Sequence, residues 1–367
     1  MTANEKLLNA AIHRAIDTHQ FSTGVVRKLI ALLNRTDRAL FEALSNALAR
    51  LPAESFTVER LEQLIFSVRD LNAQAYTQIG THLTEQVRGL AAAEAGYQFR
   101  LFSVIIPQQV LSAYPVTAVA IEQVVAGALS RPFQGRLLKE WATSIGEDRM
   151  RRIREAVRIG YVSNETNDQI IRRIRGTRAK QYSDGIIEMD RRNLAAIVNT
   201  AVSHTASSAR EEFYRGNTDL IKAVQWVSTL DSRTSDICKV RDGAQYTPIT
   251  HHPIGHLFPW LGGPGRAHIN CRSTSVPITR SFKELSGVDI PEFSPSTRAS
   301  MDGQVAADLS YGDWLQKQSA DRQDEILGKA RGEAMRSGRL PWDQMYDKKG
   351  NWLTLDQLHE RGVRIAR

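Results

Sequence analysis

The chain has 367 residues, of which 42% are hydrophobic and 24% charged, and its formal net charge is +8. This composition is typical of a globular protein with two or three domains, and it excludes a low-complexity chain. The N-terminal residues lack the pattern of a secretory signal, and polar residues and prolines interrupt the most apolar window at 104–129, so we expect no membrane segment and a cytoplasmic site of synthesis.

Residues 1–130 are predicted to form a helical N-terminal region. Ser22 and Thr23 are suited to cap a helix, because apolar residues follow them at helical spacing, and Pro52 predicts the end of that helical run. Thr57 is predicted to cap the next helix. Long amphipathic helices need partners, so we expect them to pack in a bundle.

Residues 131–215 are predicted to form a basic helical region. Between Arg149 and Lys180 there are ten basic and three acidic residues, which gives this segment a net charge of +7. Gly160 is expected to stop one helix, and Ser163 or Thr166, the latter with Gln169 in a capping box, is expected to start the next. A basic outer face is typical of phosphate contact, although an acidic protein partner or a solvated face is the alternative. The predicted contact residues are Arg151, Arg152, Arg154, Arg158, Arg172, Arg173, Arg175 and Arg178.

The hydrophobic period changes from helical to alternating after residue 216. A helix over 194–214 precedes a predicted strand at 223–230, and 272–277 is its expected partner strand. Residues 216–280 are therefore predicted to form a small α+β module with few strands. A core of this size would benefit from a metal ion or a rigid network of turns.

Residues 281–367 are predicted to comprise a linker followed by a helical tail. Pro, Ser and Gly are frequent over 282–300, which is typical of a linker. We expect Trp314, Trp342 and Trp352 to pack the tail onto the rest of the protein, and an exposed binding surface is the alternative. The predicted fold class is thus mainly α, with a helical N-terminal and central bundle, a small α+β module and a helical tail.

Both cysteines of the chain lie within one block of the α+β module. Cys238 and Cys271 are separated by a loop rich in Pro, Gly and His, and His268 stands three residues before Cys271. This spacing lets thiolate and imidazole ligands reach one ion, and that ligand set favours Zn²⁺. In a reducing compartment a disulfide is the less expected outcome. A fourth ligand is predicted from among His256, His251, His252 and Asp231.

An interpretation without metal remains open for the same block. The two cysteines would then be small buried hydrophobic residues. Hydrogen bonds and ion pairs of charged side chains would shape the turns, and Asp242 with Gly243 would form a turn under either interpretation. The charged residues concerned are Asp231, Arg233, Asp242 and Arg272.

The block also resembles a known family. A strand led by Trp is followed by Asp-x-Arg-Thr, a Cys, an Asp-Gly pair and a closing His-x-Asn-Cys-Arg. The residues concerned are Trp226, Asp231, Arg233, Thr234, Cys238, Asp242, Gly243, His268, Asn270, Cys271 and Arg272. This set is similar to the signature of the phage Mu F-like minor head proteins, also called head morphogenesis proteins. Ser235 and Ser273 lie near positions where many of these proteins carry further cysteines.

The resemblance implies a virion protein of low copy number that takes part in head assembly. Its expected partners are the portal protein, the major capsid or scaffolding protein, and double-stranded DNA. Its expected location is the capsid interior or the portal vertex, after assembly in the host cytoplasm. The basic region would then meet packaged DNA or an acidic portal surface, without reading bases.

Two functions of other classes stay open at this point. A free nucleic-acid-binding protein would use the basic region, and its DNA affinity would depend steeply on salt. A metal-dependent hydrolase or nuclease would use Cys238 with His268, or the loop histidines. No hydrolase or phosphate-loop motif accompanies these residues, so we expect the protein not to be an enzyme.

Overall fold

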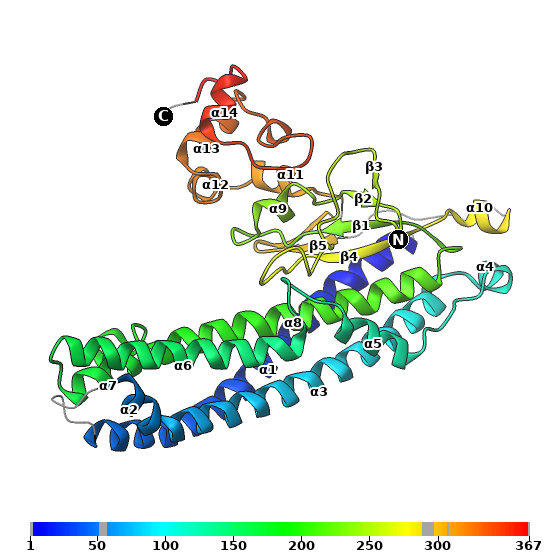
Figure 1. Cartoon of the computed structure of the whole chain (residues 1–367). Coiled ribbons are helices and arrows are strands. Elements are labelled where there is room, and N and C mark those ends of the chain that lie inside the picture. Colours follow the sequence, from blue (N-terminus) through cyan, green and yellow to red (C-terminus); the bar gives the residue numbers. More distant parts are fainter. Residues whose placement is uncertain (1–2, 51–56, 288–296, 307, 366–367) are drawn as a thin grey trace. The chain divides into compact units, whose positions relative to one another are not determined.

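The computed structural model describes residues 3–50, 57–287, 297–306 and 308–365. Over these residues helices dominate, and the strands form two small sheets (Figure 1). This confirms the predicted fold class, mainly α with a small α+β module. The helices are α1 (Ala3–Ala49), α2 (Val58–Leu64), α3 (Phe66–Ile105), α4 (Gln108–Ala113), α5 (Ile121–Ser130), α6 (Leu138–Val162), α7 (Asn167–Arg175), η2 (Arg178–Lys180), α8 (Ile186–Gly216), α9 (Asp236–Lys239), α10 (Phe282–Ser286), α11 (Tyr311–Gln316), α12 (Ala320–Leu327), α13 (Lys329–Arg336), η3 (Trp342–Gln344) and α14 (Leu355–Glu360). The strands are β1 (Ile221–Val227), β2 (Gln245–Tyr246), β3 (Pro253–Ile254), β4 (Thr274–Thr279), β5 (Thr297–Ser300) and β6 (Gly303–Ala306).

Contacts between residues divide the chain into two compact units. Unit 1 comprises residues 1–19, 91–128 and 203–367, and unit 2 comprises 20–90 and 129–202. The long helices α1, α3 and α8 contribute residues to both. The predicted division of the chain at residues 130, 215 and 280 stays a prediction.

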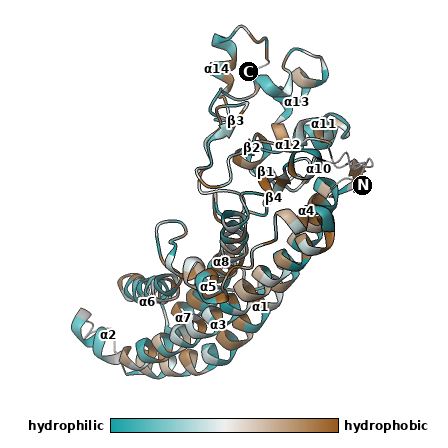
Figure 2. Ribbon diagram, turned by 90° about the vertical axis from the view of Figure 1, so that its right-hand side faces the viewer, coloured by the Kyte–Doolittle hydropathy of each residue, from teal (hydrophilic) through white to brown (hydrophobic). Residues whose placement is uncertain are grey.

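Unit 2 is built from long helices that share apolar cores. One core joins residues of α1, α3, α6 and α8, and a second joins residues of α1, α2, α6 and α7. In α1, Val25, Leu29 and Leu33 recur every four residues and are almost fully buried, which places them on one face of the helix. Figure 2 shows apolar and polar residues mixed along these helices, as expected of helices with one buried face.

The predicted helix start at Ser22 and Thr23 is wrong, because α1 continues through both residues. Ser22 is buried, and its hydroxyl donates a hydrogen bond to the side-chain oxygen of Asn199 in α8. The apolar stripe of α1 is buried over its whole length, and this packing outweighs a local capping preference. The predicted end of the run at Pro52 lies outside the described residues. Thr57 does cap α2, as predicted.

The predicted stop at Gly160 is also wrong, because α6 extends to Val162. A Cβ atom at position 160 would clash with the side chain of Ile170 in α7. The glycine therefore permits close packing of the two helices rather than ending the first. Thr166 caps α7 through a reciprocal pair of hydrogen bonds with Gln169, as predicted.

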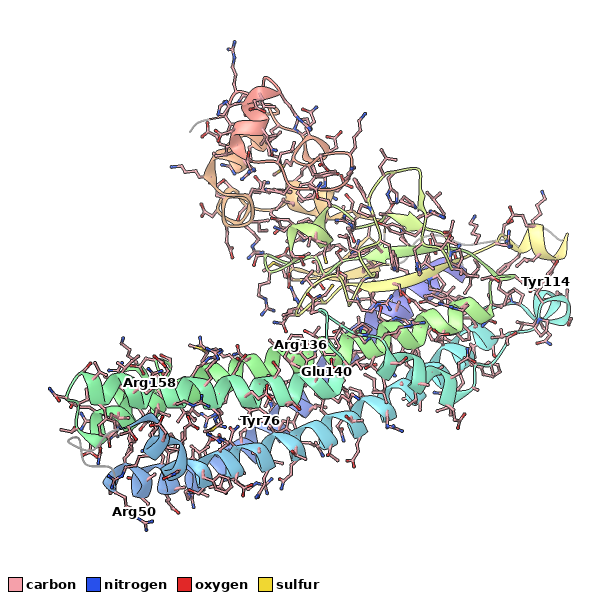
Figure 3. The ribbon with its side chains drawn as sticks, viewed as in Figure 1. Arg50, Tyr76, Tyr114, Arg136, Glu140 and Arg158 are labelled. Carbon is pink, nitrogen blue, oxygen red and sulfur yellow. The ribbon has the colours of Figure 1, made fainter. Side chains whose placement is uncertain are left out.

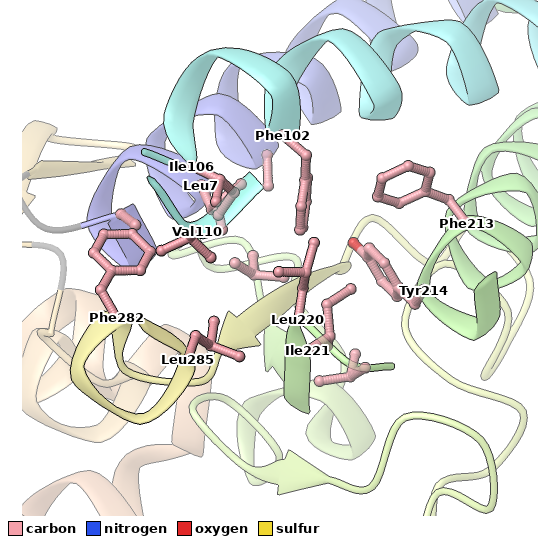
Figure 4. Close-up of a cluster of buried hydrophobic side chains, with 14 of the residues drawn as sticks. Leu7, Phe102, Ile106, Val110, Phe213, Tyr214, Leu220, Ile221, Phe282 and Leu285 are labelled. Atoms are coloured by element: carbon pink, nitrogen blue, oxygen red, sulfur yellow. The ribbon is translucent and has the colours of Figure 1, made fainter. Parts of the chain in front are cut away.

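Unit 1 contains a four-stranded antiparallel sheet in the order β3-β2-β1-β4. The pairing of β1 with β4, in which Trp226 lies opposite Ser275, confirms the predicted strand pair. Leu220 and Ile221 at the start of β1 share an apolar core with Phe102 of α3 and Phe213 of α8 (Figure 4). The sheet is thereby anchored to the helical part of unit 1.

The tail of unit 1 has a core of its own, which includes the buried rings of Tyr311 and Trp314. Trp342 and Trp352 are partly buried against this core, which also includes Leu230 of the small module, so the tryptophans pack inward and do not form the exposed surface of the alternative. The predicted linker over 282–300 begins with α10 and ends with β5, and residues 288–296 within it lie outside the described residues. In the described part of the chain, none of the helices combines the length and apolarity that a membrane span requires.

Candidate functional site

Two tight turns of unit 1 position the cysteines. Ser235 caps α9, where its side-chain oxygen faces the backbone N–H of Cys238 at 3.4 Å, so Cys238 lies in the first turn of that helix. On the other side, Cys271 N–H donates to the carbonyl of His268 at 3.2 Å, and Asn270 between them has a positive φ of 58°. Such a turn suits asparagine. Pairing of β1 with β4 then brings the two turns together.

The sulfur and imidazole groups of these turns converge. Cys238 Sγ lies 3.7 Å from Cys271 Sγ and 3.2 Å from His268 Nε2. The three possible ligand atoms all lie within 4.8 Å of one another. Both cysteines are buried, and His268 is half-buried. The group is thus closed toward the core beside Trp226 and Tyr246, with which the cysteines share an apolar cluster.

The hydrogen bonds of His268 determine which ring nitrogen carries a lone pair that faces the sulfurs. Its Nδ1 lies 2.8 Å from the backbone carbonyl of Ile269, an acceptor that only a protonated Nδ1 can satisfy. The neutral ring then has its lone pair on Nε2, which faces Cys238 and the hydroxyl of Ser235. A backbone carbonyl on the distal nitrogen is the usual support of a metal-binding histidine.

The two thiols have opposite pKa shifts. A hydrogen bond from Cys238, together with the nearby His268, lowers the pKa of Cys271 well below its ordinary value, although burial opposes this. The pKa of Cys238 is raised well above its ordinary value by the same sulfur contact and by burial. The backbone N–H of Gly265 also donates to Cys271 Sγ at 3.2 Å. Of the two cysteines, Cys271 is therefore the one whose thiolate form is stabilised by its surroundings.

The spacing of these atoms fits a tetrahedral zinc ion. With Zn–S bonds of about 2.3 Å, two thiolate sulfurs of such a site lie roughly 3.8 Å apart, and a sulfur and an imidazole nitrogen lie roughly 3.5 Å apart. The corresponding separations here are 3.7 Å and 3.2 Å. Small side-chain adjustments would complete the geometry, so Cys238, His268 and Cys271 are suited to hold one ion.

The structure does not bring the predicted fourth ligands to this group. His256 has both ring nitrogens bonded to backbone, to the carbonyl of Gln245 and to the N–H of Phe258, and burial lowers its pKa. His251 is stacked on Trp260, with ring centroids 4.4 Å apart, and His252 is exposed. Asp231 is engaged by Arg272. No other His, Cys, Asp or Glu of the described residues joins the three.

The signature residues around Asp231 form a closed network. Both carboxylate oxygens of Asp231 accept from the guanidinium of Arg272, at 2.5 and 2.8 Å. The hydroxyl of Thr234 and the backbone N–H of Arg233 also donate to it. Burial has the largest single effect on the pKa of Asp231 and raises it, but the hydrogen bonds from Arg272, Thr234 and Arg233, together with the charge of Arg272, outweigh burial and hold the pKa below its ordinary value. This network fixes the loop after β1 against the start of β4.

The signature residue Asp242 ties the module to the tail. One of its oxygens accepts from the backbone N–H of Ser228, the other from that of Tyr311 in α11, and Arg298 of β5 donates to both at 3.0 Å. Gly243 has a φ of 82°, which glycine adopts without strain, and its N–H donates to the carbonyl of Trp226. Trp226 itself is fully buried.

Sequence reasoning assigned no contact to three participants in these networks: Arg298, Tyr311 and Ser235, which it noted only beside positions that carry cysteines in related proteins. Ser235 lies 2.7 Å from His268, and its spacing of three residues from Cys238 at a helix start is the signal that would have suggested it. Arg298 and Tyr311 are separated from Asp242 by more than fifty residues, and no local pattern marks them as its partners.

Most of the predicted basic residues are paired with carboxylates in unit 2. Arg149 is almost completely buried and contacts Asp37 and Asp190, so it does not contribute to an outer face as expected. Arg158 extends from α6 and pairs with Glu155 at 3.4 Å (Figure 3). The other paired residues are Arg151 with Asp148, Arg152 with Asp190, Arg154 with Glu62, and Arg173 with Glu165.

The remaining arginines form an exposed group at the end of α7. Arg172, Arg175 and Arg178 are exposed, as is Lys180, and no ion pair joins any of them to a carboxylate in the part of the chain that the structure describes. Arg175 lies over the ring of Tyr182, 5.3 Å from its centroid. We call these four residues the α7 tip. It is the part of the predicted basic region that presents unpaired positive charge.

Comparison with known proteins addresses the same part of the chain. A family model described as Phage Mu protein F like protein matches residues 151–276. Searches of curated proteins and of solved structures gave no match. The matched segment runs from within α6 to β4 and includes the α7 tip, Asp231, Asp242 and the Cys/His group. The resemblance inferred from the signature is thereby confirmed: residues 151–276 match the phage Mu protein F-like family, which supports a phage head morphogenesis protein.

Proposed function

We propose that this chain is a minor head protein of a tailed bacteriophage and acts in head morphogenesis. The family match over residues 151–276 carries the proposal. The partners we propose are the portal protein and the major capsid or scaffolding protein, and the proposed location is the capsid interior or the portal vertex. These partners and this location follow from the family and are the parts of the proposal that need direct tests.

The hydrogen bonds made by the carboxylates of Asp231 and Asp242 support a structural role rather than a catalytic one. Both oxygens of Asp231 are held by Arg272, and both oxygens of Asp242 are held by Arg298. A general acid or base needs an oxygen within reach of the proton that it transfers. Carboxylates that accept two guanidinium hydrogen bonds each are instead suited to fix loops in place.

A phage deleted for the gene tests the assembly role. We expect it to produce heads that lack packaged DNA or fail to mature, and a plasmid copy of the wild-type gene should restore infectious particles. Electron microscopy and infectivity counts measure both outcomes. Normal yields of DNA-filled, infectious heads from the deletion phage would refute the proposal.

We further propose that the α7 tip contacts packaged DNA through its phosphates. Exposed guanidinium groups without carboxylate partners keep their charge available for phosphate, whereas paired arginines must first give up an ion pair. The tip is also compact, because Arg172, Arg175 and Arg178 lie within seven consecutive residues. The free nucleic-acid-binding alternative would use the same residues, and only the particle experiments separate it from the head protein.

The triple variant R172Q/R175Q/R178Q tests this contact. We expect weaker double-stranded DNA binding, with a slope of log affinity against log salt that is smaller by roughly three, since each lost phosphate contact accounts for about 0.9. The matched control is R151Q/R158Q, which removes two exposed arginines that are paired within α6. An equal or larger loss in the control would contradict a contact centred on the α7 tip.

We also propose that Cys238, His268 and Cys271 bind one Zn²⁺ that stabilises the small module. The convergence of three suitable ligand atoms beside a short sheet supports this. Metal analysis of the purified protein should find about one zinc per chain, and a strong chelator should lower the melting temperature. Cys271→Ser should lose the zinc and melt at the chelated temperature. Unchanged melting despite complete loss of zinc would rule out a stabilising ion.

A further inference from the structure

We propose that Ser235 holds the fourth position of this metal centre, as a weak oxygen ligand that a stronger ligand can replace. The inference rests on the zinc proposal and deepens it, because it identifies a ligand that the Cys/His spacing does not indicate. It also implies that one ligand of the centre can be exchanged. A site with two thiolates, one imidazole and one replaceable oxygen differs from a structural site closed by four strong ligands.

The position of the Ser235 hydroxyl supports the assignment. Its Oγ lies 2.7 Å from His268 Nε2, the same atom that lies 3.2 Å from Cys238 Sγ. As the capping residue of α9 it is fixed at the start of the turn that contains Cys238. The serine oxygen and the cysteine sulfur therefore approach His268 from one short segment of backbone.

The direction of the hydrogen bond indicates what the hydroxyl does without an ion. In the neutral ring, which is the form that binds a metal, Nδ1 of His268 donates to the carbonyl of Ile269, so Nε2 accepts and Ser235 donates to it. The hydroxyl thus occupies the lone pair that an ion would take. When an ion binds, Nε2 turns to the metal and the serine oxygen is left beside it. The nitrogen and oxygen of a tetrahedral site lie roughly 3.3 Å apart, so the hydroxyl needs to withdraw by only about half an ångström.

Ser273 is the other candidate for the fourth ligand position. It follows Cys271 by two residues, and its side chain also hydrogen-bonds Cys238. Its hydroxyl, however, is directed to Ser228 Oγ at 3.4 Å, and the residue is only 6% exposed. Ser235 is half-buried, like His268. A position that exchanges ligands with solvent must be reachable, and this favours Ser235.

Cobalt substitution of the full-length protein tests the assignment. Co²⁺ takes the same tetrahedral sites as zinc, and its sulfur-to-metal charge-transfer absorption grows with the number of thiolates. We expect the wild-type protein to show the absorption of two thiolates. Ser235→Cys should raise it by about half, since a third thiolate joins, and should tighten Co²⁺ binding by about tenfold or more. Ser273→Cys and Ser232→Cys are the matched controls and should leave the spectrum unchanged.

Exchange at the fourth position gives a second measurement that does not depend on a new cysteine. Imidazole added to the wild-type cobalt protein should shift its visible bands, because it displaces the serine oxygen. The same addition should not change the bands of Ser235→Cys, where a thiolate fills the position. Circular dichroism of each variant checks that it is folded.

The outcomes distinguish a failure of the metal centre from a failure of the assignment of Ser235. If the wild-type protein shows no charge-transfer absorption with Co²⁺, the metal centre itself is refuted. If the wild type shows two thiolates but Ser235→Cys adds none and imidazole has no effect, only the assignment of Ser235 fails. An increase in Ser273→Cys with none in Ser235→Cys would overturn the assignment in favour of the rival.

Discussion

Units 1 and 2 use charged residues in different ways. In unit 2, Arg149 is buried with Asp37 and Asp190 among long helices that already share extensive apolar cores. In the small module of unit 1, the sheet is short, and Asp231, Asp242 and the Cys/His group hold the connecting loops. Long helices satisfy their own backbone, whereas loops need side chains to do so.

The two regions are therefore sensitive to different substitutions. A bundle with large cores is expected to fail when a buried charge loses its partner, because the remaining charge has no water around it. A loop-rich module is expected to fail locally, where one carboxylate or one ion joins several segments.

The largest effect is expected at Arg149 of unit 2. Arg149→Met removes the buried cation between Asp37 and Asp190 and leaves them only the more exposed Arg191 and Arg152, which should lower the free energy of unfolding by about 3–5 kcal/mol. Urea denaturation of the full chain measures it. Arg151→Met, which removes an exposed pair with Asp148, should cost less than about 1 kcal/mol. Equal losses in the two variants would show that burial of Arg149 is unimportant.

A smaller and more local effect is expected at Asp242 of unit 1. Asp242→Asn removes the charge that holds the buried Arg298, which should cost about 2–3 kcal/mol. Limited proteolysis should then release the tail after residue 297 faster than from the wild type, while the helices of unit 2 stay resistant. Glu333→Gln, in an exposed pair with Arg339, is the control. If the tail of Asp242→Asn is released no faster than that of the wild type, Asp242 does not anchor the tail.

The smallest effect at neutral pH is expected at Asp190 of unit 2, where the change appears as an altered pH dependence of stability. Burial raises the pKa of Asp190 to about 7, although Arg149 and Arg152 lower it. The native state therefore keeps a proton that the unfolded chain, with a pKa of about 4, has released. The resulting stability is fully present below about pH 4 and is lost as the pH rises to about 7. Asp190→Asn should remove a slope of up to about 1.4 kcal/mol per pH unit in that window. A slope identical to that of the wild type would contradict the shift.

Local patterns in the sequence predicted the elements whose signals are themselves local. The caps at Thr57 and Thr166, the pairing of β1 with β4, and the fold class were all predictable from such signals. The spacing of His268 and Cys271 also indicated a shared turn, and the strand pairing brings Cys238 to it. Each of these depends on residues close in sequence or on adjacent strands.

Features that depend on distant contacts were not predictable in this way. The carboxylate of Asp37 lies 112 residues from Arg149, so charge counting assigned a buried arginine to an outer face. The cap signal at Ser22 failed because Asn199, far along the chain, satisfies its hydroxyl inside α1. Ser235 emerged as a neighbour of His268 only once two turns 33 residues apart were placed together.

A component of phage heads must be present in purified particles, so the abundance of this chain in particles is the first quantity to measure. Quantitative mass spectrometry of purified phage, compared with lysate of infected cells, would give the number of copies in each. We predict a few copies per mature particle, far fewer than of the major capsid protein. Absence from both mature and immature heads would contradict the account.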